Sequence, residues 1–168
     1  MSVAGPYYMD QIDDIKKTIA EQQLDIVPVE GQELDEEQQT ALDDAIAQIT
    51  DEDIYNYILE MNPDVKGIFA TNGDTTMQAL TACEGKDMKD VVIMGYDADQ
   101  EEIDAMKDGR IAGMIVQNPY GMGYATVVAE ARCALNMGNE ANVNTGYTWV
   151  TPDNIEDRTV QDILYAEK

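Results

Sequence analysis

Short apolar runs alternate along the chain with longer segments in which apolar residues return at helical spacing. The runs at 68–70, 91–94 and 114–116 are nearly continuous, which is typical of strands buried on both faces of a parallel sheet. The pattern predicts strands at 2–4, 25–29, 66–71, 91–96 and 112–117, with a weaker sixth at 147–150.

Four of the intervening segments carry helix signals. The first helix has an apolar stripe at positions 8, 12, 15 and 19, and the second runs from Asp74 to Gly85. The third ends at Gly109, and the fourth opens at Pro119 and ends before Gly138. The apolar stripe of the fourth helix consists of Tyr124, Val127, Val128, Ala131 and Leu135.

This alternation predicts an α/β fold. Strand–helix–strand units imply right-handed crossovers, so we expect a three-layer, doubly wound, mostly parallel sheet of five to six strands, flavodoxin-like or Rossmann-like. At 168 residues, the chain is expected to form one domain over 1–168. Residues 33–62 are too long for one crossover helix and predict two helices or one kinked helix, with a helix cap in 50–53.

Charge and composition remove several classes of function. The chain carries 34 acidic and 10 basic residues, a net charge of −24, and no histidine. Such a surface repels phosphate, which excludes nucleic acid and an anionic membrane as partners, and the lack of histidine excludes His-based catalysis and His-ligated metals. Cys83 and Cys133 are expected to be unpaired. The chain as written carries no signal peptide and no apolar run long enough to span a membrane.

Polar side chains follow the predicted strands. In an open parallel sheet, ligands bind at the carboxyl ends of the strands, where Asn72, Asp97 and Gln117 stand, with Tyr7 and Tyr8 after the first strand. Amides and carboxylates bond sugar hydroxyls, and tyrosine rings cover the apolar faces of a sugar, so this set favours polyol binding. The alternative is that the strand-end residues cap helices and shape turns; Asp74 and Asp99 in particular look like caps.

An ordered set of motifs over 62–155 resembles the second lobe of the ribose/galactose-type periplasmic sugar-binding proteins. It comprises NPDVKGIFATN at 62–72, VIMGYDA at 92–98, KDGRI at 107–111, VQNP at 116–119 and VTPDNI at 150–155. The resemblance implies an extracytoplasmic solute-binding protein that hands a monosaccharide to the membrane permease of an ABC transporter. It implies no enzymatic chemistry, catalytic residue, cofactor or metal.

The resemblance also implies roles for single residues. Asn72, Asp97 and Gln117 match the positions that hydrogen-bond the sugar in that family. Gln11 matches the position of a family arginine in the first helix, and Asp14 that of the glycine three residues later, so that arginine is absent here.

The chain is expected to be that second lobe without the first. Residues 1–117 then form the core, 118–142 the helix that crosses to the other lobe in the resembled family, and 143–168 a return strand and tail. The stripe of helix 119–137 would either fold back onto its own sheet or pair with another chain.

Other functions stay open at this point. One alternative is a truncated or designed half-domain that self-associates and retains no ligand. A magnesium enzyme built on Asp74, Asp97 and Asp99 is possible in this fold, although no glycine-rich phosphate loop occurs. The effector-binding core of a sugar-responsive repressor shares the fold, but no DNA-binding segment precedes it here.

Overall fold

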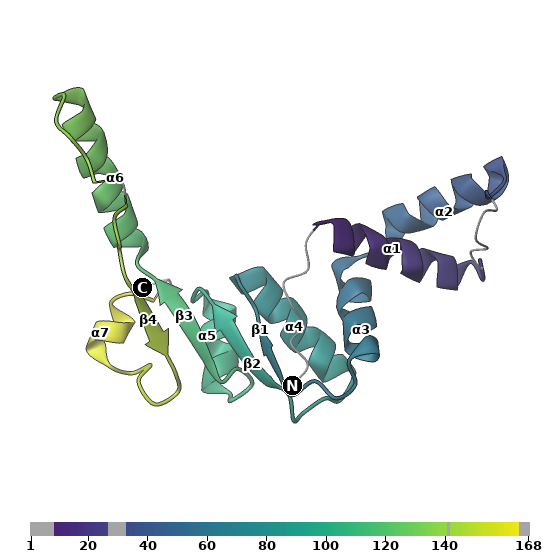
Figure 1. Ribbon diagram of the computed structural model, residues 1–168. Coiled ribbons are helices and arrows are strands. Elements are labelled where there is room, and N and C mark those ends of the chain that lie inside the picture. The colour runs from purple at the N-terminus through teal and green to yellow at the C-terminus, as the bar shows by residue number, and fades with distance from the viewer. Residues whose placement is uncertain (1–8, 27–32, 141, 165–168) are drawn as a thin grey trace. The chain divides into compact units, whose positions relative to one another are not determined.

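The computed structural model describes residues 9–26, 33–140 and 142–164 (Figure 1). The chain divides into two compact units. The first comprises Met1–Lys66 and Thr81–Lys89, and the second comprises Gly67–Leu80 and Asp90–Lys168. Helix α4, Gly73–Gly85, contributes residues to both. The prediction of a single domain over 1–168 stays a prediction.

The first unit is helical. It contains α1 (Met9–Gln23), α2 (Glu36–Gln48) and α3 (Asp51–Met61). Ile19, Ile49 and Ile54 form its buried cluster, and the expected stripe on α1 packs against that cluster through Ile12 and Ile15. Leu42 of α2 is also buried. Apolar side chains of α1 and α3 thus meet in one core with Ile49, which lies between α2 and α3, and the spacing on α1 and α3 predicts their part in it.

Residues 33–62 form two helices, which confirms one of the two readings of this segment. Ile49 and Thr50 are extended and separate α2 from α3. The Asp53 amide donates to Thr50 Oγ1 at 3.3 Å, and the Thr50 amide donates to Asp53 Oδ2 at 2.9 Å. This reciprocal pair is a capping box, with Asp in the position where Glu is usual.

The second unit is built on a four-stranded sheet. Strands β1 (Gly67–Phe69), β2 (Val92–Tyr96) and β3 (Gly113–Gln117) run parallel in that order, and β4 (Tyr147–Val150) joins β3 antiparallel. The prediction of a mostly parallel α/β fold is confirmed. The weaker sixth strand predicted at 147–150 is present as β4. The strand predicted at 2–4 lies outside the described residues.

The prediction of a strand at 25–29 is wrong for Asp25 and Ile26, the two residues of this range that the structure describes. Asp25 adopts φ 54°, and the Ile26 amide donates to the Glu21 carbonyl at 2.9 Å. These two residues therefore close the last turn of α1 instead of opening a strand, since a left-handed residue commonly ends a helix. The rest of this range lies outside the described residues.

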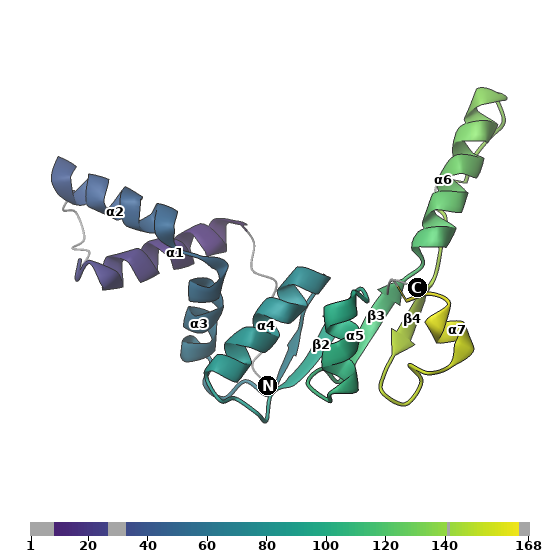
Figure 2. The same ribbon diagram turned by 180° about the vertical axis from the view of Figure 1, so that it is seen from behind.

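Helices α4 and α5 (Gln100–Lys107) lie on the same face of the sheet (Figure 2). Thr76 of α4 and Glu102 of α5 both approach Gly95 of β2, where a Cβ would lie 2.7 Å from Thr76 Cγ2 and 3.3 Å from Glu102 Oε1. On the opposite face Phe69, Val92 and Trp149 are 50%, 50% and 39% exposed. A helical layer over that second face stays a prediction.

Helix α6 (Pro119–Ala134) continues from β3 and projects away from the sheet (Figure 1). It contains no buried residue, so it does not fold back onto its own sheet. The short helix α7 (Arg158–Gln161) follows β4 and buries Val160. Within the described part of the chain, no helix is both long enough and apolar enough to cross a membrane.

Candidate functional site

The carboxyl ends of three parallel strands bring the predicted strand-end residues to one edge of the sheet. Asn72 follows β1, Asp97 follows β2 directly and Gln117 ends β3. Pairing reaches beyond the strands themselves, because the Ala70 amide donates to the Met94 carbonyl and the Asp97 amide to the Ile115 carbonyl, both at 2.9 Å. Parallel order alone therefore places these three residues at the same end.

Asp97 and Gln117 contact each other directly. Gln117 Nε2 donates to Asp97 Oδ1 at 2.8 Å, across the pair of strands β2 and β3. Both residues are half-buried. The bond orients one carboxylate and one amide side by side, which together offer acceptors and a donor to hydroxyl groups.

Asp97 also has an unusual backbone. Its φ is +80°, a left-handed conformation that residues other than glycine seldom adopt and that Asp and Asn tolerate best. The turn after β2 thus holds Asp97 in a sparsely populated conformation, which is a feature that clusters at functional sites.

Asn72 is engaged as a helix cap. Its Oδ1 accepts from the Thr75 amide at 2.9 Å, at the start of α4. Its carbonyl accepts from the Thr76 hydroxyl at 2.7 Å, and that hydroxyl accepts in turn from the Tyr96 amide at 3.4 Å. Asn72, not Asp74, therefore caps α4, because Asp74 already lies in the first turn. Asp99 is the N-cap of α5, as expected.

Asn118, which follows Gln117, has a structural role. Its Oδ1 accepts from the Gly121 amide at 2.8 Å and caps α6, while its Nδ2 donates to the Thr145 carbonyl at 3.0 Å. A Cβ at Gly121 would lie 2.5 Å from Asn118 Nδ2, so the cap requires glycine there.

Sequence reasoning did not single out Glu102, which is 1% exposed. Its Oε2 accepts from the Asp99 amide at 3.2 Å, and its buried Oε1 has no hydrogen-bond partner among the described residues. The Thr76 hydroxyl has given its one hydrogen to Asn72. Burial raises the pKa of Glu102 to about 7, and the carboxylates of Asp99 and Asp97 act in the same direction, against the Asp99 amide. The only local signal that pointed to Glu102 was its position three residues after Asp99, which is the spacing of a capping box.

A hollow of about 460 Å³ lies beside this edge. It is lined by residues from the first turns of α4 and α5, namely Gly73, Asp74, Met77, Gln78, Asp99, Gln100, Glu101 and Glu102. Four of these residues are acidic, so the hollow repels anions. In 9–26, 33–140 and 142–164, no group of three or more carboxylates, thiols or imidazoles is placed to hold a metal ion.

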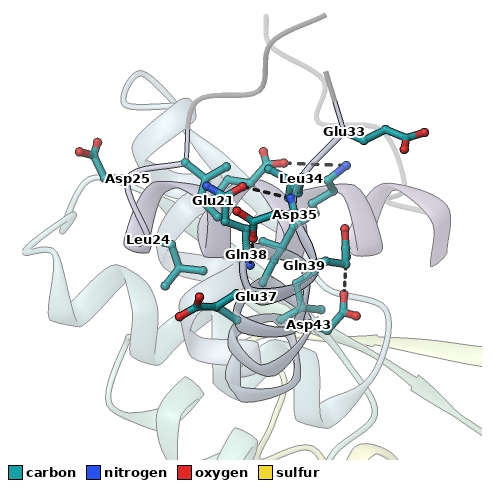
Figure 3. Close-up of a pocket in the computed structure, with 15 residues that line it drawn as sticks. Glu21, Leu24, Asp25, Glu33, Leu34, Asp35, Glu37, Gln38, Gln39 and Asp43 are labelled. Atoms are coloured by element: carbon teal, nitrogen blue, oxygen red, sulfur yellow. Dashed lines mark hydrogen bonds and ion pairs between the residues drawn. The ribbon is translucent and has the colours of Figure 1, made fainter. Parts of the chain in front are cut away.

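A larger hollow of about 920 Å³ belongs to the first unit, between α1 and α2 (Figure 3). Its rim carries Glu21, Asp25, Glu33, Asp35, Glu37 and Asp43, with Lys17 as the basic residue. Figure 3 shows Gln39 bonded to Asp43 on α2, where Gln39 Nε2 donates to Asp43 Oδ1 at 2.8 Å. This hollow is open and strongly acidic, and it contains none of the predicted ligand residues.

The remaining predicted site residues belong to the first unit or lie outside the described residues. Gln11 is an exposed residue of α1 in the first unit. Tyr7 and Tyr8 lie outside the described residues. The described edge thus joins Asn72, Asp97 and Gln117, and their role in ligand binding stays a prediction.

Sequence comparison links the chain to transport proteins. The ribose import binding proteins of Salmonella typhimurium and Escherichia coli are 35% and 33% identical to it over 66 residues. That stretch is 39% of this chain and 22% of each relative, so the chain matches about a fifth of the length of these curated proteins.

Solved structures show the same fold. A solute-binding protein of an ABC transporter from Agrobacterium vitis, with bound D-fucose, is 21% identical with a TM-score of 0.61, over 91% of this chain and 62% of that one. A second from the same organism, bound with α-D-tagatopyranose, is 18% identical with a TM-score of 0.63, over 93% and 60%. Residues 2–134 match the family described as "Periplasmic binding protein domain". The chain therefore belongs to the periplasmic binding protein domain family.

Proposed function

We propose that this chain is the carbohydrate-binding lobe of an ABC-transporter solute-binding protein. A monosaccharide would be held by hydrogen bonds at the carboxyl edge of β1, β2 and β3, with Asp97 and Gln117 as its main contacts and Asn72 beside them. Tyr7 and Tyr8, from their place after the first predicted strand, and Gln11, from the resemblance of the sequence, are further proposed contacts. The lobe would bind its ligand without changing it.

One observation carries this proposal: the bond of 2.8 Å between Gln117 Nε2 and Asp97 Oδ1. The bond leaves the second proton of the amide and the remaining acceptor positions of both groups in fixed directions. A carboxylate accepts from two neighbouring hydroxyls and an amide both donates and accepts, which suits a ring carrying adjacent hydroxyl groups. The left-handed backbone of Asp97 supports the same reading.

The charge around the edge favours a neutral ligand. Asp74, Asp99 and Glu101 line the adjoining hollow beside the buried Glu102. Their summed negative potential opposes a sugar phosphate or a sugar acid but leaves an uncharged sugar unaffected. The ligand proposed is therefore a neutral pentose or hexose.

The location of the parent protein and its transport partner are proposed from the family. The parent protein would be extracytoplasmic, either periplasmic or a lipoprotein of the cell surface, and would deliver its sugar to a membrane permease. Affinity of this chain alone is expected to be millimolar or weaker, because an open edge encloses only one side of a ligand. Losing four to six hydrogen bonds, in all roughly 3–6 kcal/mol, corresponds to about 10²–10⁴ in affinity.

Titration of the ¹⁵N-labelled chain with a panel of pentoses and hexoses tests the proposal. We expect saturable shifts of the amide signals of residues 72, 97 and 117 for one class of sugar. Asp97→Ala or Gln117→Ala should abolish them, whereas Asp108→Ala, which removes the same charge from an exposed position near Arg110, should not. No saturable shift with any sugar, or equal binding by Asp97→Ala, would contradict the proposal.

A further inference from the structure

A buried carboxyl group stands behind the candidate site, and one of its oxygens has no hydrogen-bond partner. Glu102 of α5 is 1% exposed, and its Oε2 accepts from the Asp99 amide at 3.2 Å. Its Oε1 lies against β2, because a Cβ at Gly95 would be 3.3 Å from that oxygen. Among the described residues, none bonds Oε1. A buried polar atom without a bond costs free energy, so the state of this oxygen matters to the fold.

The hydroxyl of Thr76 lies close to this oxygen but has no hydrogen to give it. A Cβ at Gly95 would also lie 3.1 Å from Thr76 Oγ1, and the Thr76 side chain is within hydrogen-bonding reach of Glu102. The one hydrogen of the hydroxyl goes to the Asn72 carbonyl at 2.7 Å. The hydroxyl oxygen accepts from the Tyr96 amide at 3.4 Å and keeps one lone pair free. Two acceptor oxygens therefore meet here, and a proton between them would join them.

Glu102 supplies that hydrogen when it carries its own proton on Oε1. The neutral carboxyl group then donates to Thr76 Oγ1, while Oε2 keeps the bond from the Asp99 amide. Both oxygens of Glu102 have partners in this form, and the Thr76 hydrogen stays on Asn72. Burial raises the pKa of Glu102 to about 7, which agrees with a neutral group below that pH.

The charges around Glu102 act in the same direction as its burial. Asp99, the cap of α5, and Asp97, in the turn after β2, both raise its pKa, against the bonds from the Asp99 amide and the Thr76 side chain. Asp74 of α4 and Glu101 of α5 line the adjoining hollow, and none of the residues that line it is a lysine or an arginine. Ionisation of Glu102 therefore adds a negative charge beside several others without a cation to balance it.

Thr76 joins the two strand ends that carry candidate ligand residues. Its hydroxyl bonds the carbonyl of Asn72, which follows β1, and the amide of Tyr96, the last residue of β2. Asp97 comes next in the chain and accepts from Gln117 Nε2 at 2.8 Å. The direction in which one hydroxyl group donates thus bears on the geometry of both strand ends.

We propose that Glu102 is a positioning residue of the candidate site, whose proton keeps the ends of β1 and β2 in the geometry described. With the proton in place, the Thr76 hydroxyl accepts from Glu102 and donates to Asn72. Where it concerns a sugar, this inference rests on the proposed function: the edge then binds its ligand more tightly below neutral pH than above it.

Loss of the proton to water reverses the direction of the hydroxyl. The carboxylate then takes the Thr76 hydrogen, because a hydrogen bond to a charged acceptor is stronger than one to a neutral carbonyl. The Asn72 carbonyl loses its bond of 2.7 Å and keeps those from the Thr76 amide and the Thr75 hydroxyl, both at 3.0 Å. The turn after β1 is held less firmly as a result.

NMR titration of the ligand-free full chain tests this coupling. The side-chain carboxyl signal of Glu102 should titrate with a midpoint near pH 7, and the backbone signals of residues 72 and 96 should shift with the same midpoint. Glu102→Gln carries a permanent donor, so those two signals should stay near their low-pH positions from about pH 5 to about pH 8. Glu101→Gln, at the exposed neighbouring position, should keep the titration of the parent chain.

Two variants of Thr76 separate a hydrogen-bonded relay from packing alone. Thr76→Val keeps a branched side chain without the hydroxyl, so residues 72 and 96 should no longer follow the titration of Glu102. Thr76→Ser keeps the hydroxyl and should retain the response. Equal responses in the two variants would overturn the relay. If the valine chain does not fold, the comparison of Glu102→Gln with the parent chain decides.

Sugar binding gives a second readout. For a sugar that shifts residues 72, 97 and 117, affinity should be about 2- to 10-fold weaker at about pH 8 than at about pH 6, which is the worth of one hydrogen bond. Glu102→Gln should remove this difference. Equal affinity of the parent chain at both pH values would overturn the effect of the proton on the site.

The two readouts distinguish failure of this inference from failure of the proposed function. If residues 72 and 96 follow the proton of Glu102 but no sugar binds at any pH, the proposed function is wrong and the coupling stands. If they do not follow it in the parent chain, or follow it unchanged in Glu102→Gln, the coupling is wrong whether or not a sugar binds.

Discussion

Thr76 lies against the backbone of Gly95 so closely that a side chain at residue 95 has no room. A Cβ there would lie 2.7 Å from Thr76 Cγ2 and 3.1 Å from Thr76 Oγ1. Thr76 is fully buried, and its hydroxyl bonds both the Asn72 carbonyl and the Tyr96 amide. This contact holds α4 on the sheet beside the candidate site.

Gly95→Ala should therefore destabilise the second unit. Overpacking of a buried contact between α4 and β2 is expected to lower the free energy of unfolding by about 1–3 kcal/mol. Urea unfolding monitored by circular dichroism measures this. Gly123→Ala is the control, because no heavy atom lies within 4 Å of its added Cβ and alanine favours the helix. Equal stability of the two variants would refute the contact.

Gly113→Ala should displace Trp149, the sole tryptophan of the chain. A Cβ at Gly113 would lie 2.5 Å from Trp149 Cζ2, on the face of the sheet opposite α4 and α5. We expect the indole to move toward solvent, which red-shifts its fluorescence. Gly67→Ala, where the nearest atom is 3.4 Å from the added Cβ, should leave the emission unchanged. An unshifted spectrum for Gly113→Ala would show that Trp149 does not cover β3.

Glu102 should make stability depend on pH. Its pKa is raised to about 7 in the folded state, from an ordinary value of 4.5. The folded chain then binds this proton more tightly than the unfolded chain does, so the free energy of unfolding should fall as pH rises from about 4.5 to about 7 and then level off. The pKa shift corresponds to about 3 kcal/mol as an upper figure.

Glu102→Gln removes that titration. The variant should be more stable than the parent chain at pH 8 by about 1–3 kcal/mol and should show a flatter stability profile between pH 5 and 7. Chemical unfolding across this pH range is the measurement. Glu101→Gln, at the exposed neighbouring position, should keep the profile of the parent chain. Parallel profiles for Glu102→Gln and the parent would disprove the buried titration.

Thr50→Ala should weaken the start of α3. It removes the hydroxyl that accepts from the Asp53 amide and that helps hold the pKa of Asp53 below its ordinary value. A loss of about 1 kcal/mol in the stability of the first unit is expected. Thermal unfolding followed by circular dichroism measures it. Thr40→Ala, inside the exposed face of α2, is the matched control and should be neutral, since alanine is the better helix former.

The elements that sequence reasoning predicted well depend on neighbours close in the chain. Pro119 indicates the start of α6, and Thr50 with Asp53 indicates the start of α3. The parallel order of β1, β2 and β3 follows from apolar runs separated by helices, and it alone sends Asn72, Asp97 and Gln117 to one edge. Local chemistry determines these features because caps and periodicity act over three or four residues.

Tertiary structure decided what those residues do. The bond between Gln117 and Asp97 joins positions 20 residues apart, and nothing local distinguished Asn72 as a cap from Asn72 as a ligand. Glu102 has the spacing of an ordinary capping residue, yet the approach of Thr76 and Gly95 buries it. The stripe on α6 was visible in the sequence, but only the bonds from Asn139 to the Ala129 carbonyl and from Asn118 to the Thr145 carbonyl show which side of the helix the returning chain contacts. Burial and side-chain pairing depend on segments that are distant in sequence, so only the folded chain specifies them.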